Sequence, residues 1–450
     1  MRCGKVVIVL TALAACALAS AREGDLDTSF NGSGTLAFSI RDAQPAIDSG
    51  NALAIQADGK IVVVGTTYEV EPPTSRWTAT RINSDGSLDA TFGTNGRTAL
   101  NLGAHTQSAA PIALVIQDDG KIVVGGYYDL HLAIARLNVD GTLDSSFGNG
   151  GVWLGNPVGG MTQPYVSTMS LIAQPTGGQM IVFAGGAPTG SGSNFLRGFI
   201  DSTGQYPHMD VIAGPLTFSN FNAMVQQGNK FLMVGSSVSA SGLGTCSSRR
   251  YRLGRSGLGN LQFFADPIFV VSDITFGSGA TPQCHLDSTA LLPNGDVVLG
   301  GHQTDGGSNE VTVAYGLNGA DGRMNDRMIP DAFVSAFPTT SVALSQGDGK
   351  VILSGTSVVG NRQGFFLQRR LWQSGNQSVD PTFGNAGTAT INFDHAGVTT
   401  NSYMSATALD RYGRIVAVGT TEDVGQTSVT HVAVMRLLSD VIFRNGFETN

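Results

Sequence analysis

The sequence pattern with the clearest chemical meaning is an arginine and an aspartate that recur in a repeat of about 60 residues. The aspartates belong to a Leu-Asp-x-x-Phe type of motif, at Asp27, Asp89, Asp144 and Asp380. The arginines lie on an expected strand, at Arg81, Arg136, Arg252, Arg370 and Arg436, with Phe199 and Gly316 as departures. Such a set forms either a ring of charge for a ligand or a structural pair, in which the aspartate caps its own corner and the arginine packs between units. We favour the structural interpretation, because features repeated in most units usually serve the unit.

No motif in the sequence predicts a catalytic residue, a metal site or a cofactor. Residues 85–89 and 140–144 each place two carboxylates beside a glycine turn, but they lack the ligand series of a calcium loop. The seven histidines form no pair at metal-binding spacing. Cys284 and His285 are adjacent, whereas a catalytic Cys–His pair is brought together by the fold. Enzymatic activity stays open, because active sites of repeat proteins gather from separate units and need no local motif.

Aromatic residues near the ends of expected strands are the candidates for ligand contact. They are Tyr68, Trp77, Tyr127 and Tyr128. Aromatic side chains of this kind bind carbohydrate or protein, and the alternative is that they pack within the fold.

The element that positions these residues is a hairpin, first seen as QADGKIVVVG at residues 56–65. An Asp-Gly turn between apolar strands predicts a two-residue hairpin. The motif recurs seven times, one copy being degenerate, and its closing glycines are Gly65, Gly126, Gly185, Gly235, Gly301, Gly355 and Gly419. Four strands fit within one unit, as at residues 51–56, 60–65, 76–83 and 97–102.

The two ends of the chain complement each other. The last unit stops after residues 431–440, where a corner and a fourth strand should follow, and residues 24–38 supply that corner and strand without the three strands before them. A closed ring needs this split, whereas an open solenoid does not. The sequence therefore predicts an all-β fold, a seven-bladed β-propeller of four-stranded blades that is closed by the N-terminal strand completing the last blade.

The turns at one end of the expected blades are uniform Asp-Gly corners, and the connections at the other end are predicted to be long and irregular. The irregular connections are residues 69–77, 127–131, 187–194, 236–250 and 302–310. Variable loops on a rigid scaffold often bind ligands, so we expect binding at this end.

The recurring DGKIVVVG, the ARLN of residues 135–138 and the LDxxFG corner resemble the bacterial delta-60 repeat of secreted and cell-surface proteins. The resemblance covers nearly all of residues 22–440, and it is strongest in the first, second and sixth units. It implies a propeller-like, non-catalytic protein outside the cytoplasm. It implies no ligand and no functional residue.

Residues 1–21 have the layout of a secretory signal peptide, because Arg2 and Lys5 precede an apolar run that is too short to span a bilayer. Cleavage after Ala21 gives a soluble product, whereas lipidation of Cys16 in Leu-Ala-Ala-Cys gives a lipoprotein. Either outcome predicts a secreted protein or one at the outer cell surface or in the periplasm. Residues 441–450 lie outside the repeat and form either a sorting tag or a frayed terminus.

Composition narrows the partners. Glycine accounts for 60 of 450 residues and charged residues for only 13%, which suits short strands and tight turns. The net charge of −8, without a basic run, argues against nucleic acid as a partner.

Cys246 and Cys284 are the cysteines beyond the leader, and in an oxidising compartment they predict one disulfide, the alternative being two thiols. No other segment is apolar enough to cross a membrane, and we expect a monomer.

Two functions fit the sequence. The first is an exported, non-catalytic scaffold that binds an unknown protein or carbohydrate ligand through the irregular end. The second is a hydrolase or lyase that acts on extracellular polymers.

Overall fold

The computed structural model describes residues 22–41, 47–69, 74–103, 108–156, 160–174, 177–257, 260–267, 272–275, 283–304, 310–328, 342–346, 348–359, 361–372, 378–394, 397–425 and 429–439. In these ranges the chain forms strands and turns, and no helix is long and apolar enough to cross a membrane. The predicted signal peptide with Cys16 and the predicted tail at 441–450 lie outside the described residues.

Three of the five sheets have four antiparallel strands each. The first contains β6 (Ala109–Ile116), β7 (Ile122–Tyr128), β8 (His131–Leu137) and β9 (Val152–Gly155). The second contains β19 (Gln283–Leu291), β20 (Val297–Thr304), β21 (Glu310–Leu317) and β22 (Met324–Met328). The third contains β23 (Val342–Ser345), β24 (Lys350–Val359), β25 (Arg362–Leu371) and β26 (Thr388–Ile391).

The eight-stranded sheet consists of two antiparallel sets that meet at one residue pair, Ile47 with Thr430. One set contains β2 (Ile47–Ile55), β3 (Ile61–Glu69), β4 (Thr74–Ile82) and β5 (Arg97–Ala99). The other contains β27 (Thr400–Leu409), β28 (Ile415–Asp423) and β29 (Thr430–Leu437), with β1 (Thr35–Phe38) paired to β29. The N-terminal segment therefore supplies the strand that the C-terminal repeat lacks.

The nine-stranded sheet also consists of two sets, which meet at the single pairs Ser193 with Phe218 and Gly186 with Asn220. One set contains β10 (Tyr165–Ala173), β11 (Gln179–Thr189), β12 (Gly192–Ile200) and β13 (His208–Ile212). The other contains β14 (Phe218–Gln227), β15 (Lys230–Val238), β16 (Gly244–Arg255), β17 (Leu261–Ala265) and β18 (Ser272–Thr275), the last two both pairing with β16.

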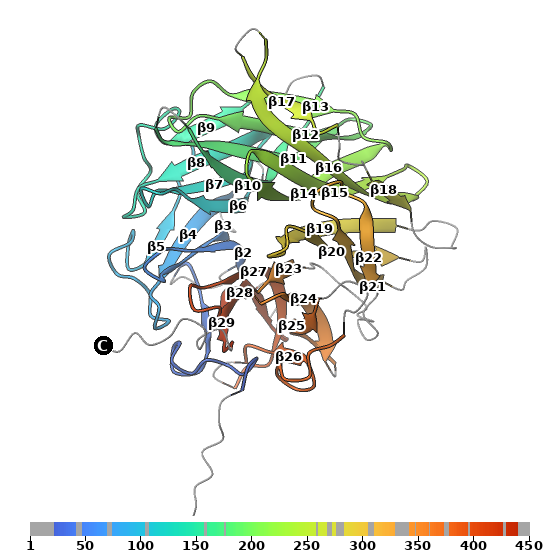
Figure 1. Cartoon of the computed structure of the whole chain (residues 1–450). Coiled ribbons are helices and arrows are strands. Elements are labelled where there is room, and N and C mark those ends of the chain that lie inside the picture. The colour runs from blue at the N-terminus through green and yellow to red at the C-terminus, as the bar shows by residue number, and fades with distance from the viewer. Residues whose placement is uncertain are drawn as a thin grey trace, which may run out of the picture.

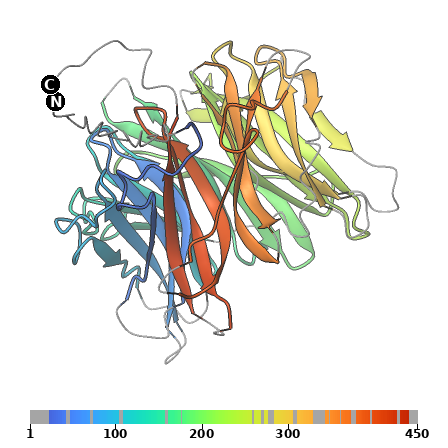
Figure 2. The same cartoon turned by 90° about the horizontal axis from the view of Figure 1, so that it is seen from below.

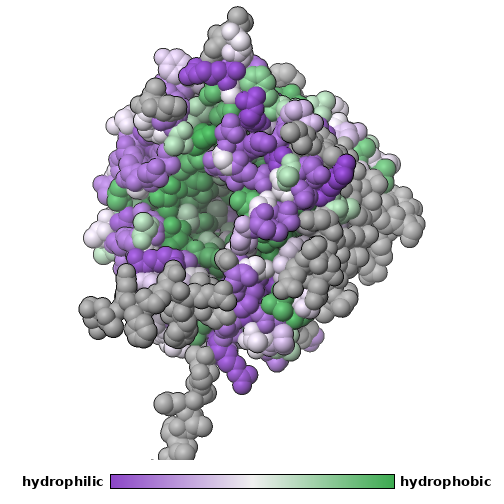
Figure 3. All heavy atoms as spheres, in the orientation of Figure 1, coloured by the Kyte–Doolittle hydropathy of each residue, from purple (hydrophilic) through white to green (hydrophobic). Residues whose placement is uncertain are grey.

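The first strand of each set lies nearest the middle of the molecule, and the later strands lie progressively farther out (Figure 1). Each of these inner strands contacts the next one along the chain, and the last contacts the first: β2, β6, β10, β14, β19, β23 and β27. Figure 2 shows the same sheets edge-on, with their strands running between two ends of the molecule. Figure 3 shows a hollow near the middle of one face, with mainly hydrophobic residues on its walls.

The predicted hairpin is confirmed. In the first copy, Gly59 has a φ of 87°, and the Gly59 amide donates to the carbonyl of Gln56 across the turn. Glycine is required at the closing position for a different reason, because a Cβ atom at Gly65 would lie 1.7 Å from the carbonyl oxygen of Ser49. The same clash with a first-strand carbonyl arises at Gly126, Gly185, Gly235, Gly301 and Gly419. Only glycine lets the two strands approach this closely.

The apolar run after the turn is buried on both faces. Val62 and Val64 pack with residues of β7 in one hydrophobic cluster, whereas Ile61 and Val63 pack with residues of β28 in another. Because each side of β3 meets a neighbouring sheet, the strand is apolar at every position instead of at alternate ones.

The connections between second and third strands are shorter than the sequence predicted. Residues 129–130 link β7 to β8, residues 190–191 link β11 to β12, and residues 239–243 link β15 to β16. The backbone ladder continues past the closing glycine, so that Tyr128 pairs with His131 and Val238 with Gly244. The expectation of long irregular loops at 127–131, 187–194 and 236–250 was therefore wrong, because most of these residues extend the strands.

Candidate functional site

The two ends of the strands carry different polar groups, and we name each end by its turns. The corner end holds the first hairpin turns and the third-to-fourth strand connections, such as residues 57–60 and 83–96. The loop end holds the second-to-third strand connections, such as residues 129–130 and 190–191.

At the corner end, five repeats place one carboxylate between two cations. Each cluster has a third-strand arginine, an aspartate, and a lysine or arginine from the hairpin turn. The clusters are Arg81–Asp89–Lys60, Arg136–Asp144–Lys121, Arg250–Asp266–Lys230, Arg369–Asp380–Lys350 and Arg436–Asp27–Arg414.

The first cluster shows how these groups hold the repeat together. Oδ2 of Asp89 lies 2.7 Å from Nε of Arg81 and 2.9 Å from Nζ of Lys60. Its Oδ1 accepts hydrogen bonds from the Thr91 amide at 3.0 Å and the Thr91 hydroxyl at 2.7 Å. Arg81 also donates to the carbonyl of Val139 in the next repeat and lies over the ring of Phe92. The aspartate thus caps its own corner and the arginine joins neighbouring repeats, which confirms the structural interpretation.

Electrostatics agree with this role. Burial raises the pKa of the Asp89 carboxyl, but its hydrogen bonds to Lys60, Thr91 and Arg81 outweigh burial and leave the pKa well below its usual range. The same balance lowers the pKa of Asp144. These carboxylates are held ionised by groups of the protein itself.

Two predicted arginines were assigned to the wrong position. Arg250 and Arg369, not Arg252 and Arg370, occupy the place of Arg81, because the strand register pairs Arg250 with Leu232 and Arg369 with Ile352. The error arose because each of these strands carries more than one arginine near this position, Arg249, Arg250 and Arg252 in β16 and Arg369 and Arg370 in β25. Arg252 instead lies over the ring of Phe264.

The predicted departures, Phe199 and Gly316, do occupy the place of Arg81 in their repeats, opposite Val182 and Val298. The same two repeats have Met180 and Asp296 five residues before the closing glycine, where the first repeat has Lys60. The arginine and the turn cation are therefore lost together, as expected of members of one structural cluster.

Six of the inner strands have a bulge within the strand, one residue after the pairing with the closing glycine: β2, β6, β10, β14, β19 and β27. At three bulges the extra residue donates to a carbonyl of the next inner strand: Asn51 to Pro111 at 2.9 Å, Ser167 to Phe221 at 2.5 Å, and Asn222 to Leu286 at 2.8 Å. In each case the accepting carbonyl belongs to the residue just before the next repeat's own bulge position. These side chains join neighbouring repeats near the middle of the molecule.

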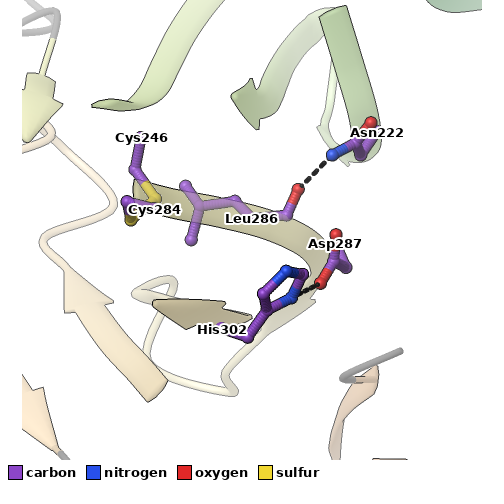
Figure 4. The surroundings of a disulfide bond; sticks show 6 residues. All are labelled: Asn222, Cys246, Cys284, Leu286, Asp287 and His302. Atoms are coloured by element: carbon purple, nitrogen blue, oxygen red, sulfur yellow. Dashed lines mark hydrogen bonds and ion pairs between the residues drawn. A yellow bond between two sulfur atoms is a disulfide. The ribbon is translucent and has the colours of Figure 1, made fainter. Parts of the chain in front are cut away.

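Asp287 occupies the bulge in β19 and breaks this pattern, because an ionised carboxylate has no hydrogen to donate. Its Oδ2 lies 2.9 Å from Nδ1 of His302 on β20. Figure 4 shows the contrast, with Asn222 reaching the Leu286 carbonyl while Asp287 points toward His302. Both side chains are partly accessible, with 22% of Asp287 and 16% of His302 exposed.

A second histidine completes the group. The ring of His285 stacks on that of His302, with centroids 4.6 Å apart. Burial and the neighbouring His302 lower the pKa of His285, so its neutral form is favoured. A bulge that redirects a side chain and a histidine with a perturbed pKa are both features found at functional sites. We take His285, Asp287 and His302 as the candidate site.

The predicted disulfide between Cys246 and Cys284 is confirmed and lies beside this site (Figure 4). It joins β16 to the start of β19, both cysteines are fully buried, and their Cα atoms are 5.1 Å apart. It therefore fixes the strand that carries His285 and Asp287. Cys284 is therefore a disulfide cysteine, and it does not form a nucleophilic pair with the adjacent His285.

The four predicted aromatic contacts separate into two groups. Trp77 is fully buried and its indole nitrogen donates to the carbonyl of Tyr127, and Tyr128 is 5% exposed with its hydroxyl donating to the carbonyl of Gly103. These two side chains are placed for packing and not for contact with a surface ligand. Tyr68 is 39% exposed and Tyr127 is half-buried, and they are not brought together with Asp287 and His302.

Within the described ranges, no three His, Cys, Asp or Glu side chains are arranged to hold a metal ion. Asp85 accepts hydrogen bonds from Ser87, and Asp89 faces Arg81 and Lys60, so the two carboxylates of residues 85–89 do not converge. Sequence reasoning missed Asp287 and His302. The available signal for Asp287 was its bulge position, which carries Asn or Ser in four other repeats and Ile112 in the second.

Comparison with known proteins adds the fold family. No curated protein matches the sequence. Similar solved structures include a protein of unknown function from Dyadobacter fermentans (13% identity, TM-score 0.46, covering 90% of this chain and 99% of that chain) and a polysaccharide lyase, an ulvan lyase (10%, 0.48, 86% and 93%). Another is the β-propeller domain of the trilobed protease from Pyrococcus furiosus (9%, 0.40, 88% and 99%). At this level of likeness, the activities of these proteins do not transfer to this chain.

The first two repeats give a more specific match. A family profile described as a domain of unknown function (DUF5122) β-propeller matches residues 56–92 and 117–147. Those ranges contain the hairpin, the third strand and the corner of the two best-preserved repeats. With its all-β sheets, the chain is therefore a propeller-type protein.

Proposed function

We propose that the chain is an exported seven-bladed β-propeller that binds a protein or glycan ligand at its loop end. The blade count is supported by the seven inner strands, each in contact with the next and the last in contact with the first. The closure is supported by the pairing of β1 with β29 and of Asp27 with Arg436. Residues 22–440 form the propeller in this proposal.

Deletion of residues 22–38 tests the closure. We expect the shortened mature chain to lose its cooperative unfolding transition, because Arg436 loses Asp27 and β29 becomes an uncovered edge. A synthetic peptide of residues 22–38 should restore the transition when added. A shortened chain as stable as the full one refutes the ring.

Export is the second part of the proposal. Its support is the Cys246–Cys284 disulfide, since such bonds persist in oxidising compartments. Residues 1–21 are then removed as a signal peptide, or Cys16 is lipidated, and residues 441–450 act as a sorting tag on a monomer. Mass spectrometry of the mature protein distinguishes an N-terminus at Arg22 from a lipidated Cys16, and a mature chain that keeps residues 1–15 contradicts both.

The observation that carries the binding proposal is Asp287. Polar side chains at three other bulges join one repeat to the next, whereas Asp287 pairs with His302 of its own repeat. A polar group that departs from the structural pattern and remains partly accessible is suited to contact a ligand.

The test is binding of the full mature chain to an array of extracellular glycans, with Asp287→Asn and His302→Gln beside the wild type. Binding that both variants weaken by about tenfold or more supports the site. Tyr412→Ala is the matched control, because Tyr412 is exposed near the turn between β27 and β28 at the corner end. Equal binding by the wild type and both site variants assigns the ligand elsewhere and contradicts the proposal.

The Asp287–His302 pair also favours a second candidate, an enzyme acting on an extracellular polymer. A carboxylate on Nδ1 orients the ring and leaves the lone pair of a neutral histidine on Nε2, the arrangement of a general base. Incubation with the polysaccharides that bind then decides between the two. Release of oligosaccharides that His302→Gln abolishes makes the protein an enzyme, and binding without release makes it a scaffold.

A further inference from the structure

A cavity of about 690 Å³ lies along the outer strands of the first three repeats. Its walls come from residues 101–103 after β5, from residues 148–154 around β9, and from Gly204, Gln205 and Pro207 before β13. It shares no residue with the Asp287 site, so it is a separate feature of the molecule.

The cavity exists because the third repeat has lost its corner. Residues 138–151 connect β8 to β9 through the Leu-Asp-x-x-Phe corner, whereas residues 201–207 alone connect β12 to β13. Gly204 still packs against the backbone of Gly148, where a Cβ atom would lie 2.5 Å from the Gly148 nitrogen. The two repeats therefore meet as elsewhere, but the missing corner leaves its space open.

Tyr206 stands in the shortened connection in an unusual conformation. Its φ is 51° and 85% of it is exposed. The other described non-glycine residues with positive φ are Asn31, Asn95, Asp129 and Ala386, which are small or locally hydrogen-bonding residues. A bulky aromatic residue is disfavoured in this conformation, and exposure removes packing as the reason for it. The backbone holds an aromatic ring in solvent between two residues that line the cavity.

The cavity itself combines an aromatic ring with uncharged polar groups. Trp153 is half-buried, and its ring is held from one side by Phe183, with centroids 5.8 Å apart. Asn101, Asn149 and Gln205 contribute exposed amides, and the described lining residues carry no formal charge. Aromatic rings present a flat apolar surface, and amides both donate and accept hydrogen bonds, as hydroxyl groups require.

We propose that this cavity is a binding site for a neutral saccharide. The ring of Trp153 supports one face of a sugar, Tyr206 covers it from the rim, and the amides of Asn149 and Gln205 bind its hydroxyl groups. The absence of charge among the described lining residues disfavours an acidic sugar, because no cation there compensates its carboxylate.

Tryptophan fluorescence of the mature chain is a direct test, because Trp77 and Trp372 are buried and Trp153 is the partly exposed tryptophan of the three. The probes are the neutral hexasaccharides of glucose, mannose and xylose, with oligogalacturonate as the acidic comparison. We expect at least one neutral probe to shift the emission and protect Trp153 from acrylamide quenching.

Two variants separate binding from folding. Tyr206→Asn places a residue that tolerates positive φ, so it should fold at least as well as the wild type while binding the probe about tenfold more weakly. Tyr412→Ala removes an exposed tyrosine at the corner end of another repeat and should bind normally. Three results overturn the proposal: no response to any neutral probe, unchanged affinity in Tyr206→Asn, or equal affinity for oligogalacturonate.

Discussion

Asp89 lies in a corner connection and Asp287 lies in the middle of an inner strand, and the partners of the two aspartates differ. Asp89 lies between two permanent cations, Arg81 and Lys60, and only 4% of it is exposed. Asp287 is 22% exposed in its side chain and pairs with a histidine, His302. The first carboxylate has equivalents in four other repeats, and the second has none in the described bulges.

In a repeat protein, residues that recur and residues that depart from the repeat have different roles. A cluster that recurs in several repeats has a structural role, because every copy packs against the same kind of neighbours. A residue that abandons the recurring bond, as Asp287 abandons the donation made by Asn222, has another use. The corner clusters therefore join neighbouring repeats, and Asp287 departs from the bond made at other bulges.

The disulfide beside the candidate site gives the largest expected effect. Replacing both Cys246 and Cys284 by alanine should lower the free energy of unfolding by about 4 kcal/mol, because a closed loop of 38 residues no longer restricts the unfolded chain. Urea denaturation of the mature protein measures the loss. Reductant should then have no further effect on the variant, and a loss below about 1 kcal/mol argues that the bridge does not hold the loop end together.

Asn222→Asp places a carboxylate, as at Asp287, in a bulge whose side chain normally joins two repeats. The variant loses the donor to the Leu286 carbonyl and places a carboxylate against that oxygen, so unfolding should become easier by about 2 kcal/mol. Asn222→Ser is the control, since Ser167 makes the same bond with a hydroxyl, and it should lose less than about 1 kcal/mol. If both variants are equally stable, the bulge bonds do not hold neighbouring repeats together.

Acid should weaken the charge clusters at the corner end. The pKa values of Asp27, Asp89, Asp144 and Asp380 are all lowered in the folded chain, so the unfolded chain binds more protons at acidic pH. Their contribution is complete above the unfolded value of about 4 and is lost as pH falls below it. Urea denaturation at pH 5, 4 and 3 should show this decline, with a shallower slope in Asp89→Asn. A wild type equally stable at pH 3 and pH 5 contradicts the role of these clusters.

The sequence predicted the repeating features well. The Asp-Gly hairpin, the closing glycine, the N-terminal strand beside β29 and the disulfide could all be predicted, because each depends on local turn chemistry or on a pattern repeated many times. It also predicted the structural pairing of arginine with aspartate, although Arg252 and Arg370 were chosen where Arg250 and Arg369 make the pair.

The candidate sites could not be predicted, because each is an exception. The role of Asp287 can be inferred only once the strand register places it at a bulge that Asn51, Ser167 and Asn222 use to join repeats. Tyr206 has no distinctive sequence context, and its exposure and positive φ follow from the loss of a corner. The buried state of Trp77 likewise depends on a neighbouring repeat, whose Tyr127 carbonyl accepts its indole hydrogen.

The most direct test changes Asp89 and Asp287, one at a time, to asparagine and measures the free energy of unfolding of each variant. Asp89→Asn should lower it by about 3 kcal/mol, because two cations lose their shared counter-charge in a buried site. Asp287→Asn should leave it within about 0.5 kcal/mol of the wild type, since the amide regains the donor used at Asn51 and Asn222. Equal losses at the two positions would show that Asp287 is a structural residue like Asp89. That result would contradict the functional role proposed for Asp287.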